Sequence, residues 1–252
     1  MFMKERHDLI VQLVNEAGRV TVTDLAQRFD VSEDSIRRDL NILAEQGQLE
    51  RVYGGAICTQ TMPERSILKR EESVEAKHLI AKKAYEEICE DDTIYLDVST
   101  TVHALAECIA EGSKHLTVVS NSLDTLQTLA SCAHVKAIGT GGLVHARQNA
   151  FISSATIASL EQFRFSKAFI GALSIDMDED AVTTFEEEDG LIKRTALKNS
   201  RRSYLLADAN KFSRHGNFKT ASLGEFSHII CDEVPQKYKK ALREKGLEVL
   251  EA

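Results

Sequence analysis

Side chains suited to binding an anion recur in the second half of the chain, directly after short apolar runs. Two of these runs, at 93–97 and 116–120, precede helical patterns, so hydroxyl and backbone N–H groups meet at two expected helix N-termini. Such groups hold a phosphate without a dedicated lysine. A third run, at 135–139, precedes glycines that permit close approach of the backbone. We expect an anion site formed by Asp97, Ser99, Thr100, Thr101, Ser120, Asn121, Gly141 and Gly142.

Each of these loops also has an ordinary structural reading. Ser and Thr cap helices in most proteins, and paired glycines end strands, so one such loop alone is more often structural than functional. Three of them at successive strand ends favour a ligand site. The third loop lacks the last glycine of a dinucleotide fingerprint, and no GxxxxGK[ST] loop occurs, so the sequence shows no nucleotide-binding motif.

Three charged residues further along the chain extend this candidate site. Lys193 lies early in a helical pattern that begins at Gly190, and Asp208 and Lys211 follow another apolar run. A lysine neutralises a ligand phosphate, and a carboxylate accepts a hydrogen bond from a sugar hydroxyl. As lone residues, such side chains are more often surface charges.

The elements that must position these residues alternate between strand-like and helix-like patterns. The apolar runs suited to strands are 93–97, 116–120, 135–139, 167–172, 203–208 and 227–231. Helices are expected at 73–88, 102–110, 122–130, 154–163, 190–200 and 236–245. This alternation predicts a mostly parallel α/β sheet, in which ligands bind beyond the C-terminal ends of the strands.

A helix-turn-helix is predicted near the N-terminus. Apolar residues at helical spacing predict a helix over 4–17, and Thr21 begins a short second helix. After a tight connection, Ser32 caps a third helix over 32–46. Alone, this third segment fits a solvated amphipathic helix equally well, but its neighbours favour a recognition helix. Its polar face carries Ser35, Arg37 and Arg38.

A wing is predicted beside these helices. Strands at 48–53 and 56–59 are joined by two glycines, which let backbone N–H groups approach a duplex closely. An arginine in this wing can pair with a phosphate. We therefore expect DNA contacts from Thr21, Ser32, Ser35, Arg37, Arg38, Arg51, Tyr53 and Gly54.

The charge balance limits how this head binds DNA. Residues 1–60 contain seven Lys and Arg against ten Asp and Glu, so a single copy would bind DNA poorly. We expect a homo-oligomer, a dimer or tetramer, that places two or more heads on spaced half-sites. The net charge of −8 argues against a protein that coats nucleic acid non-specifically.

Length and composition set the domain organisation. A winged helix-turn-helix domain is expected over 1–60, a junction over 61–72 and an α/β effector-binding domain over 73–252. Five scattered cysteines without a C-x-x-C pair suit reduced thiols rather than disulfides or a zinc site, and we expect no cofactor and no metal. No signal peptide and no apolar run of membrane-spanning length is present, so a cytoplasmic location is expected.

The segment 32–56, S-x-x-S-I-R-R-D-L-N-x-L-x-x-Q-G-x-L-x-R-V-Y-G-G-A, resembles the DNA-binding head of the DeoR-type family of bacterial transcriptional repressors. At Tyr53 that family commonly has a histidine. The resemblance covers nearly the whole chain and implies operator binding. It also implies an effector domain that is similar in fold to ribose-5-phosphate isomerase. In the family, this domain binds phosphorylated sugars or related metabolites. The motifs of that domain correspond to residues 97–101, 120–122, Gly141, Gly142, Lys193, Asp208 and Lys211.

Three places differ from the family pattern. Ser99 stands where the family usually has glycine, and residues 151–153 replace a segment where a glycine is expected. The loop 176–189 is strongly acidic and lacks the usual glycine-threonine turn. An acidic loop near the site would repel an anionic ligand, but we expect this loop to be a solvated face.

The leading prediction is a transcriptional repressor of a sugar-metabolism operon whose DNA binding is controlled by a phosphorylated sugar or related metabolite. We expect no enzymatic activity and no catalytic residue. One alternative is a phosphosugar isomerase-like enzyme with a DNA-binding domain, in which Asp97 or Asp208 acts as general base. Another is an activator, since the sign of regulation depends on where the operator lies.

Overall fold

The computed structural model describes residues 3–17, 19–52, 54–57, 73–214 and 216–252. The chain forms two compact units, residues 1–68 and 69–252, which are taken separately here. Tyr53 and the expected junction at 61–72 lie outside the described residues. Within the described ranges, no helix is long and apolar enough to cross a membrane.

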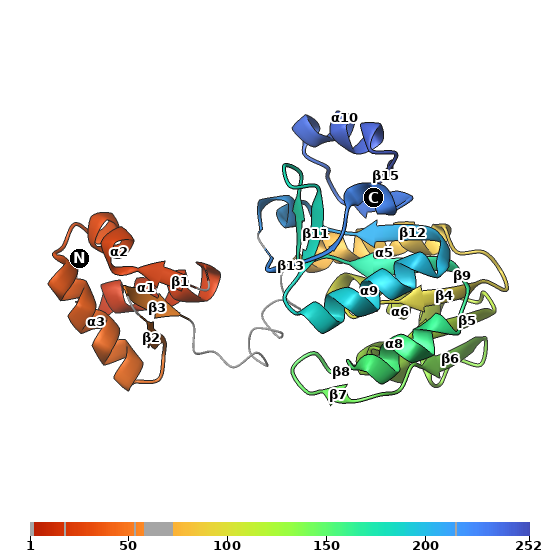
Figure 1. The fold of residues 1–252 in the computed structure, drawn as a ribbon, viewed down its shortest axis with the longest axis horizontal. Coiled ribbons are helices and arrows are strands. Elements are labelled where there is room, and N and C mark those ends of the chain that lie inside the picture. The colour runs from red at the N-terminus through yellow and green to blue at the C-terminus, as the bar shows by residue number, and fades with distance from the viewer. Residues whose placement is uncertain (1–2, 18, 53, 58–72, 215) are drawn as a thin grey trace. The chain divides into compact units, whose positions relative to one another are not determined.

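The first unit, the head, combines three helices with a small antiparallel sheet (Figure 1). Its elements are α1 (Met3–Ala17), β1 (Arg19–Thr21), α2 (Val22–Phe29), α3 (Glu33–Glu45), β2 (Glu50–Val52) and β3 (Gly55–Ile57). The sheet order is β1-β3-β2, so the wing hairpin pairs with a strand that precedes α2. Strand β1 is not expected from the sequence, because three residues are too few to show an alternating pattern and pairing with β3 defines it.

The core of the head explains the orientation of α3. Ile36, Leu40 and Leu43 are fully buried against apolar residues of α1, α2 and the sheet. Their spacing is that of one helix face, so the opposite face of α3 is exposed to solvent. The winged helix-turn-helix predicted from the sequence is confirmed.

The second unit, the sensor unit, is built on a sheet of seven parallel strands in the order β15-β14-β12-β9-β4-β5-β6. These strands are β4 (Thr93–Leu96), β5 (Leu116–Ser120), β6 (Val135–Gly139), β9 (Phe165–Gly171), β12 (Ser200–Leu206), β14 (His228–Cys231) and β15 (Glu248–Glu251). All run in the same direction, so their C-terminal ends meet at one edge. The mostly parallel α/β fold is therefore confirmed, while β15 is an added edge strand.

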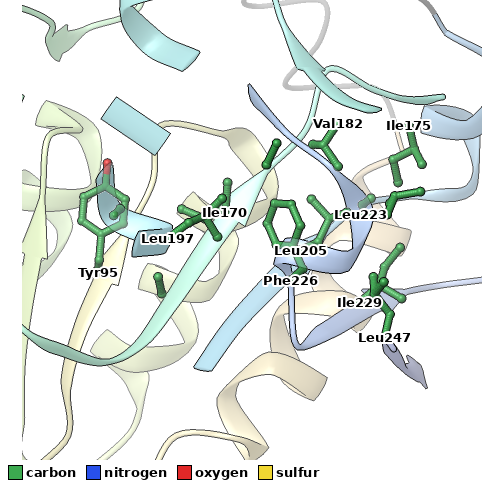
Figure 2. Packing of buried hydrophobic residues seen from close by; sticks show 14 of the residues in the cluster. Tyr95, Ile170, Ile175, Val182, Leu197, Leu205, Leu223, Phe226, Ile229 and Leu247 are labelled. Atoms are coloured by element: carbon green, nitrogen blue, oxygen red, sulfur yellow. The ribbon is translucent and has the colours of Figure 1, made fainter. Parts of the chain in front are cut away.

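Helices cover both faces of this sheet (Figure 1). They are α5 (Val74–Glu86), α6 (Thr100–Glu111), α7 (Leu123–Leu129), α8 (Ser154–Glu161), α9 (Glu187–Lys198) and α10 (Gln236–Glu244). Successive strand residues alternate between two cores: Ile94 and Leu96 pack with α5 and α6, whereas Tyr95 packs with α8 and α9. Figure 2 shows the second of these cores.

Short strands outside the main sheet are not expected from the sequence. Strands β10 (Ser174–Asp176), β11 (Ala181–Thr184) and β13 (Phe218–Ala221) form a separate antiparallel sheet, and β7 (Val144–His145) pairs with β8 (Ala150–Phe151). Two 3-10 helices, η1 (Ala209–Ser213) and η2 (Leu223–Glu225), follow β12 and β13. Ile175 and Val182 join the small sheet to the same core as Leu223 and Phe226 (Figure 2).

Candidate functional site

The recognition helix of the head begins as predicted at Ser32. The Ser32 hydroxyl accepts from the Ser35 backbone N–H at 3.3 Å, and the two hydroxyls lie 2.9 Å apart. Thr21 caps α2 in the same way through the Asp24 N–H at 3.1 Å. Both side chains satisfy helix N–H groups that have no partner within the helix. Thr21 and Ser32 are therefore helix caps, and the Ser35 hydroxyl contacts that of Ser32, whatever DNA contacts the three residues add.

The two arginines of α3 differ in their surroundings. Arg37 bonds to Asp34 at 2.7 Å and to Glu33 at 2.6 Å, one turn earlier on the same helix. Arg38 is exposed, and among the described residues no ion pair holds its guanidinium. Arg38 is thus available to an incoming duplex, whereas Arg37 must first leave two carboxylates.

Asp39 anchors the recognition helix to α1, a role that the sequence analysis missed. Its buried carboxylate accepts from Arg6 Nε at 2.7 Å and pairs with His7 Nε2 at 2.9 Å. Burial raises the pKa of Asp39, but the hydrogen bonds and charges of Arg6 and His7 outweigh burial and lower it below its usual value. In the sequence, an acidic residue that follows two arginines is typical of an exposed helix face. Only the contact with α1 in the folded head shows that Asp39 is an anchor.

The wing is braced from within. Arg51 Nη1 donates to the Gly55 carbonyl at 3.0 Å, across the turn formed by Gly54, which has φ +80°. Gly55 is buried, and a Cβ atom there would lie 2.0 Å from the Val20 carbonyl oxygen. Gly55 is therefore required by close packing on β1, whereas Gly54 is exposed at the tip of the wing.

The sensor unit places most of the predicted anion-binding residues at one edge of the sheet. Asp97 follows β4, and Ser99 caps α6 by accepting from the Val102 N–H at 3.1 Å, with Thr100 and Thr101 in the first turn. Ser120 ends the neighbouring strand β5, and its hydroxyl donates to the Leu96 carbonyl at 2.7 Å. The two loops are thus joined directly, side by side.

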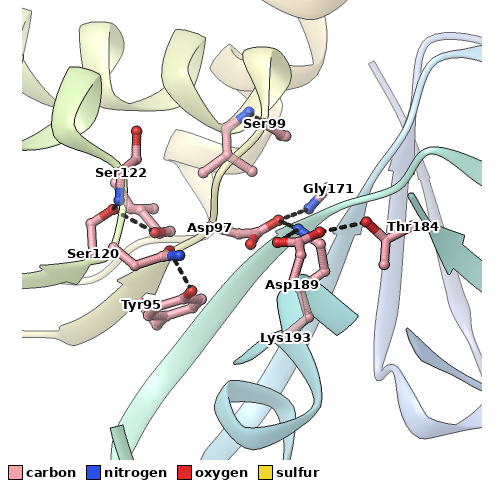
Figure 3. Close-up of polar contacts among 12 residues, drawn as sticks. Tyr95, Asp97, Ser99, Ser120, Ser122, Gly171, Thr184, Asp189 and Lys193 are labelled. Atoms are coloured by element: carbon pink, nitrogen blue, oxygen red, sulfur yellow. Dashed lines mark hydrogen bonds and ion pairs between the residues drawn. The ribbon is translucent and has the colours of Figure 1, made fainter. Parts of the chain in front are cut away.

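Asn121 and Ser122 stabilise the loop that follows β5. The Tyr95 hydroxyl, labelled in Figure 3, donates to the buried Asn121 amide oxygen at 2.8 Å. The Asn121 amide nitrogen donates to the Phe151 carbonyl at 3.1 Å. Ser122 caps α7 through the Thr125 N–H at 3.3 Å. Asn121 therefore holds the loop in place with its side chain, through its amide oxygen and one of its two N–H donors.

The glycine loop after β6 completes the predicted cradle. Gly141 and Gly142 have φ +69° and +115°, conformations that L side chains rarely adopt. A Cβ atom on Gly142 would lie 2.4 Å from Ser153 Oγ and 2.6 Å from Thr156 Oγ1. Ser153 also caps α8 and accepts from the Leu143 N–H at 3.2 Å. The segment 151–153 thus brings a third helix N-terminus to the glycine loop, which was not foreseen.

Lys193 reaches the site as part of a buried ion cluster (Figure 3). Its Nζ lies 2.5 Å from Asp97 Oδ2 and 3.3 Å from Asp189 Oδ1, and Asp189 also accepts from the Thr184 hydroxyl. Asp97 Oδ2 accepts in addition from the Gly171 N–H at 3.0 Å. All three charged residues are buried, with exposed fractions of 3% for Lys193, 0% for Asp97 and 3% for Asp189.

The charged groups in this cluster shift the pKa values of one another. Burial, together with the negative charge of Asp189, raises the pKa of Asp97 against the opposing effect of Lys193. Burial lowers the pKa of Lys193, but the two carboxylates outweigh it and raise that pKa. Asp97 Oδ1 accepts no hydrogen bond from the described residues although it is fully buried. A buried acceptor without a donor is costly, so this oxygen is suited to a ligand hydroxyl.

The acidic loop was wrongly expected to be entirely a solvated face. Asp189 is buried because it neutralises Lys193 from the next turn of α9. Glu186 accepts from Gln148 Nε2 at 2.9 Å and so ties the β7–β8 hairpin to the start of α9. Asp180 pairs with Lys245 at 3.0 Å. The partners of Glu186 and Asp180 lie far away in sequence, so no local pattern indicates those contacts.

Ser99 and Gly171 explain one departure from the family pattern. A Cβ atom on Gly171 would lie 2.3 Å from both Cβ and Oγ of Ser99. The Ser99 side chain is therefore accommodated by the absence of one on the neighbouring strand β9. The added hydroxyl serves α6 as a cap.

Asp208 and Lys211 form a pair of their own. They lie at the start of η1 after β12, two strands away from β4 in the sheet order, and their charged atoms are 3.7 Å apart. The structure gives no direct contact of Asp208 with the Asp97, Lys193 and Asp189 cluster among the described residues. It also brings together no group of three or more His, Cys, Asp or Glu side chains suited to a metal ion in the parts it describes.

The chain was compared with known proteins. Residues 6–61 match the DeoR-like helix-turn-helix domain, and residues 72–233 match the DeoR C terminal sensor domain. The chain is 32% identical over 240 residues to the glycerol-3-phosphate regulon repressor of Escherichia coli (strain K12), with 93% of each chain covered. It is 33% identical to the L-fucose operon activator of Haemophilus influenzae, covering 91% of this chain and 92% of that protein. It is 32% identical to the lactose phosphotransferase system repressor of Staphylococcus aureus, covering 90% and 91%.

Part of the chain also aligns with solved structures. Ribose 5 phosphate isomerase A from Neisseria gonorrhoeae aligns with a TM-score of 0.38 and 18% identity over 54% of this chain and 52% of its own. The eIF2B delta chain from Chaetomium thermophilum aligns with a TM-score of 0.44 and 14% identity over 64% and 61%.

Proposed function

Because this chain belongs to the DeoR family of transcriptional regulators, we propose that it binds an operator through its winged head and represses genes of sugar metabolism. Relatives similar along nearly their whole length are named as repressors of glycerol-3-phosphate and lactose phosphotransferase genes. An activator of an L-fucose operon is also among them, so activation is the alternative sign of the same function.

Two heads are needed for tight binding in this proposal. The head carries more acidic than basic residues, so few phosphate contacts are available to one copy. A homo-oligomer that binds two half-sites supplies the missing affinity. Arg38 and the wing tip at Gly54 are the exposed groups that we assign to the duplex, with Arg37 joining once it leaves Glu33 and Asp34.

The proposed effector is a phosphorylated sugar or polyol bound at the strand ends of the sensor unit. The N-termini of α6 and α8 and the glycine loop offer neutral donors to a phosphate, while Lys193 is already neutralised by two carboxylates. The observation that carries this proposal is the buried, unpaired Oδ1 of Asp97 beside those donors. It accepts from a hydroxyl, so the favoured ligand carries hydroxyl groups as well as a phosphate.

The test is a thermal-shift series with glycerol 3-phosphate, ribose 5-phosphate and fructose 6-phosphate, with the corresponding unphosphorylated compounds as controls. A ligand that binds only the native state raises its stability by mass action. We expect a phosphorylated compound to raise the melting temperature of the sensor unit and its unphosphorylated partner to have no effect. Equal behaviour of both members of every pair would refute the phosphate cradle.

The isomerase-like alternative is tested in the same samples. Aldose-ketose interconversion needs a general base within reach of the substrate, and this alternative assigns that role to the buried, unpaired Oδ1 of Asp97. The named relatives are transcriptional regulators, which favours binding without turnover. Conversion of ribose 5-phosphate to ribulose 5-phosphate by the purified chain would establish the alternative.

A further inference from the structure

The 3-10 helix η1 joins two candidate effector residues to the start of the sensor unit. Asp208 caps η1 by accepting from the Asn210 N–H at 3.0 Å, and Lys211 pairs with Asp208. Between them, Asn210 Nδ2 donates to the Ser73 hydroxyl at 3.2 Å, across 137 positions of sequence. One short segment thus carries both an anion-pairing lysine and a contact to a distant residue.

Ser73 occupies a particular place in the chain. It is the first described residue after the head, and it immediately precedes α5. Its φ of +53° is uncommon for a residue other than glycine, and its hydroxyl does not cap α5. A non-glycine residue keeps such a conformation only where surrounding contacts hold it. Among the described residues, Asn210 is the one that donates a hydrogen bond to the Ser73 hydroxyl.

The buried ion cluster is linked to the same 3-10 helix from the other side. The Thr184 hydroxyl donates to Asp189, which fixes β11 to α9. Strand β11 pairs with β10, and β10 packs against η1, with Ile175 and Phe212 in one core. A ligand that disturbs either Asp189 or the Asp208 and Lys211 pair therefore acts on η1.

We propose that the hydrogen bond from Asn210 to Ser73 transmits effector occupancy to the point where the chain enters the sensor unit, and so controls operator affinity. Asn210 is a positioning residue in this scheme, because it acts through Ser73. The inference rests on the proposed function, since a ligand couples to DNA binding only if it binds two states of the protein differently.

The experiment measures operator affinity of the full chain by fluorescence anisotropy, on a duplex selected from a random pool by the parent protein. Each protein is measured alone and with the sugar phosphate that gave the largest thermal shift. The parent is expected to change its operator affinity at least about fivefold with that compound. In Asn210→Ala and in Ser73→Ala, the compound is expected to change operator affinity less than about twofold. Calorimetry is expected to show that both variants bind the compound as tightly as the parent does. The double variant is expected to behave like either single one, because the two changes remove the same contact.

Asn217→Ala is the matched control, since Asn217 is an exposed asparagine a few residues away whose side chain forms no hydrogen bond with the described residues. A full effector response in both Asn210→Ala and Ser73→Ala would overturn the inference but leave the proposed function intact. If no compound binds, the proposed effector site fails, and the inference fails with it, because there is then no effector occupancy to transmit.

Discussion

Lys193 Nζ lies 2.5 Å from Oδ2 of Asp97, although the two residues are 96 positions apart in sequence. This ion pair joins α9 to the end of β4 in the centre of the candidate effector site, and Asp189 completes it from the next turn. The lysine that the sequence offers to a ligand phosphate is thus engaged inside the protein. In our proposal, the helix N-termini bind the phosphate of the ligand, and Asp97 accepts a hydrogen bond from a sugar hydroxyl.

Replacing Lys193 by methionine is expected to destabilise the sensor unit by about 3 to 5 kcal/mol, because it leaves two buried carboxylates without their cation. Calorimetric unfolding of the full chain measures this as a lower temperature for the transition of the larger unit. Lys198→Met, which removes an exposed cation from the end of the same helix, is the control. Equal losses in the two variants would show that the ion pair contributes nothing specific.

Asp39→Asn is expected to destabilise the head by about 1.5 to 3 kcal/mol, because a charge-assisted bond to Arg6 is weakened. The pKa of Asp39 is lowered in the folded head, so its contribution is present above its unperturbed value of 3.8 and is lost as the pH falls through the folded value. Urea unfolding should therefore separate parent and variant at neutral pH and bring them together in acid. A difference that does not depend on pH would contradict the ionic anchor.

If Arg38 hydrogen-bonds a base edge, Arg38→Ala is expected to weaken operator binding by about 1 to 3 kcal/mol. If Arg38 pairs with a phosphate, the variant is expected to reduce the slope of log affinity against log salt concentration by about 1. Arg37→Ala should cost less, because the free protein already satisfies Arg37 with Glu33 and Asp34. Titrations at several salt concentrations distinguish these outcomes. Parent-like binding by Arg38→Ala at equal salt would show that α3 is not the recognition helix.

Gly142→Ala is expected to abolish the thermal shift given by sugar phosphates, because its Cβ atom would collide with the hydroxyls of Ser153 and Thr156. Gly141→Ala provides the matched control, since Gly141 has a positive φ but open space around its Cβ position. Both variants bear backbone strain of about 1 kcal/mol or more. Only the crowded one should lose ligand binding, and loss in neither would remove the glycine loop from the site.

The sequence predicts those features that are local. The Ser32 cap, the apolar face of α3 and the apolar strands that precede Asp97 and Ser120 each depend on residues close together in the chain. Such patterns also place the loops correctly, because parallel strands bring their C-terminal ends to one edge.

The remaining features depend on contacts between distant segments. The sequence around Asp189 does not show that it is buried, because Asp189, Lys193 and Thr184 are enclosed only when α9 packs against β9 and β11. Asp39 is missed for the same reason, since Arg6 and His7 lie on another helix. Three-residue strands such as β1 and β10 are too short for any periodicity and exist through their pairing.

The central claim is that a phosphorylated sugar bound at the strand ends of the sensor unit controls operator binding by the head. Its most direct test is the operator affinity of the parent protein with and without a sugar phosphate that calorimetry shows to be bound, measured beside Gly142→Ala. We predict a change of at least about fivefold in the parent and none in the variant. A compound that saturates the sensor unit of the parent and leaves its operator affinity unchanged would contradict the claim.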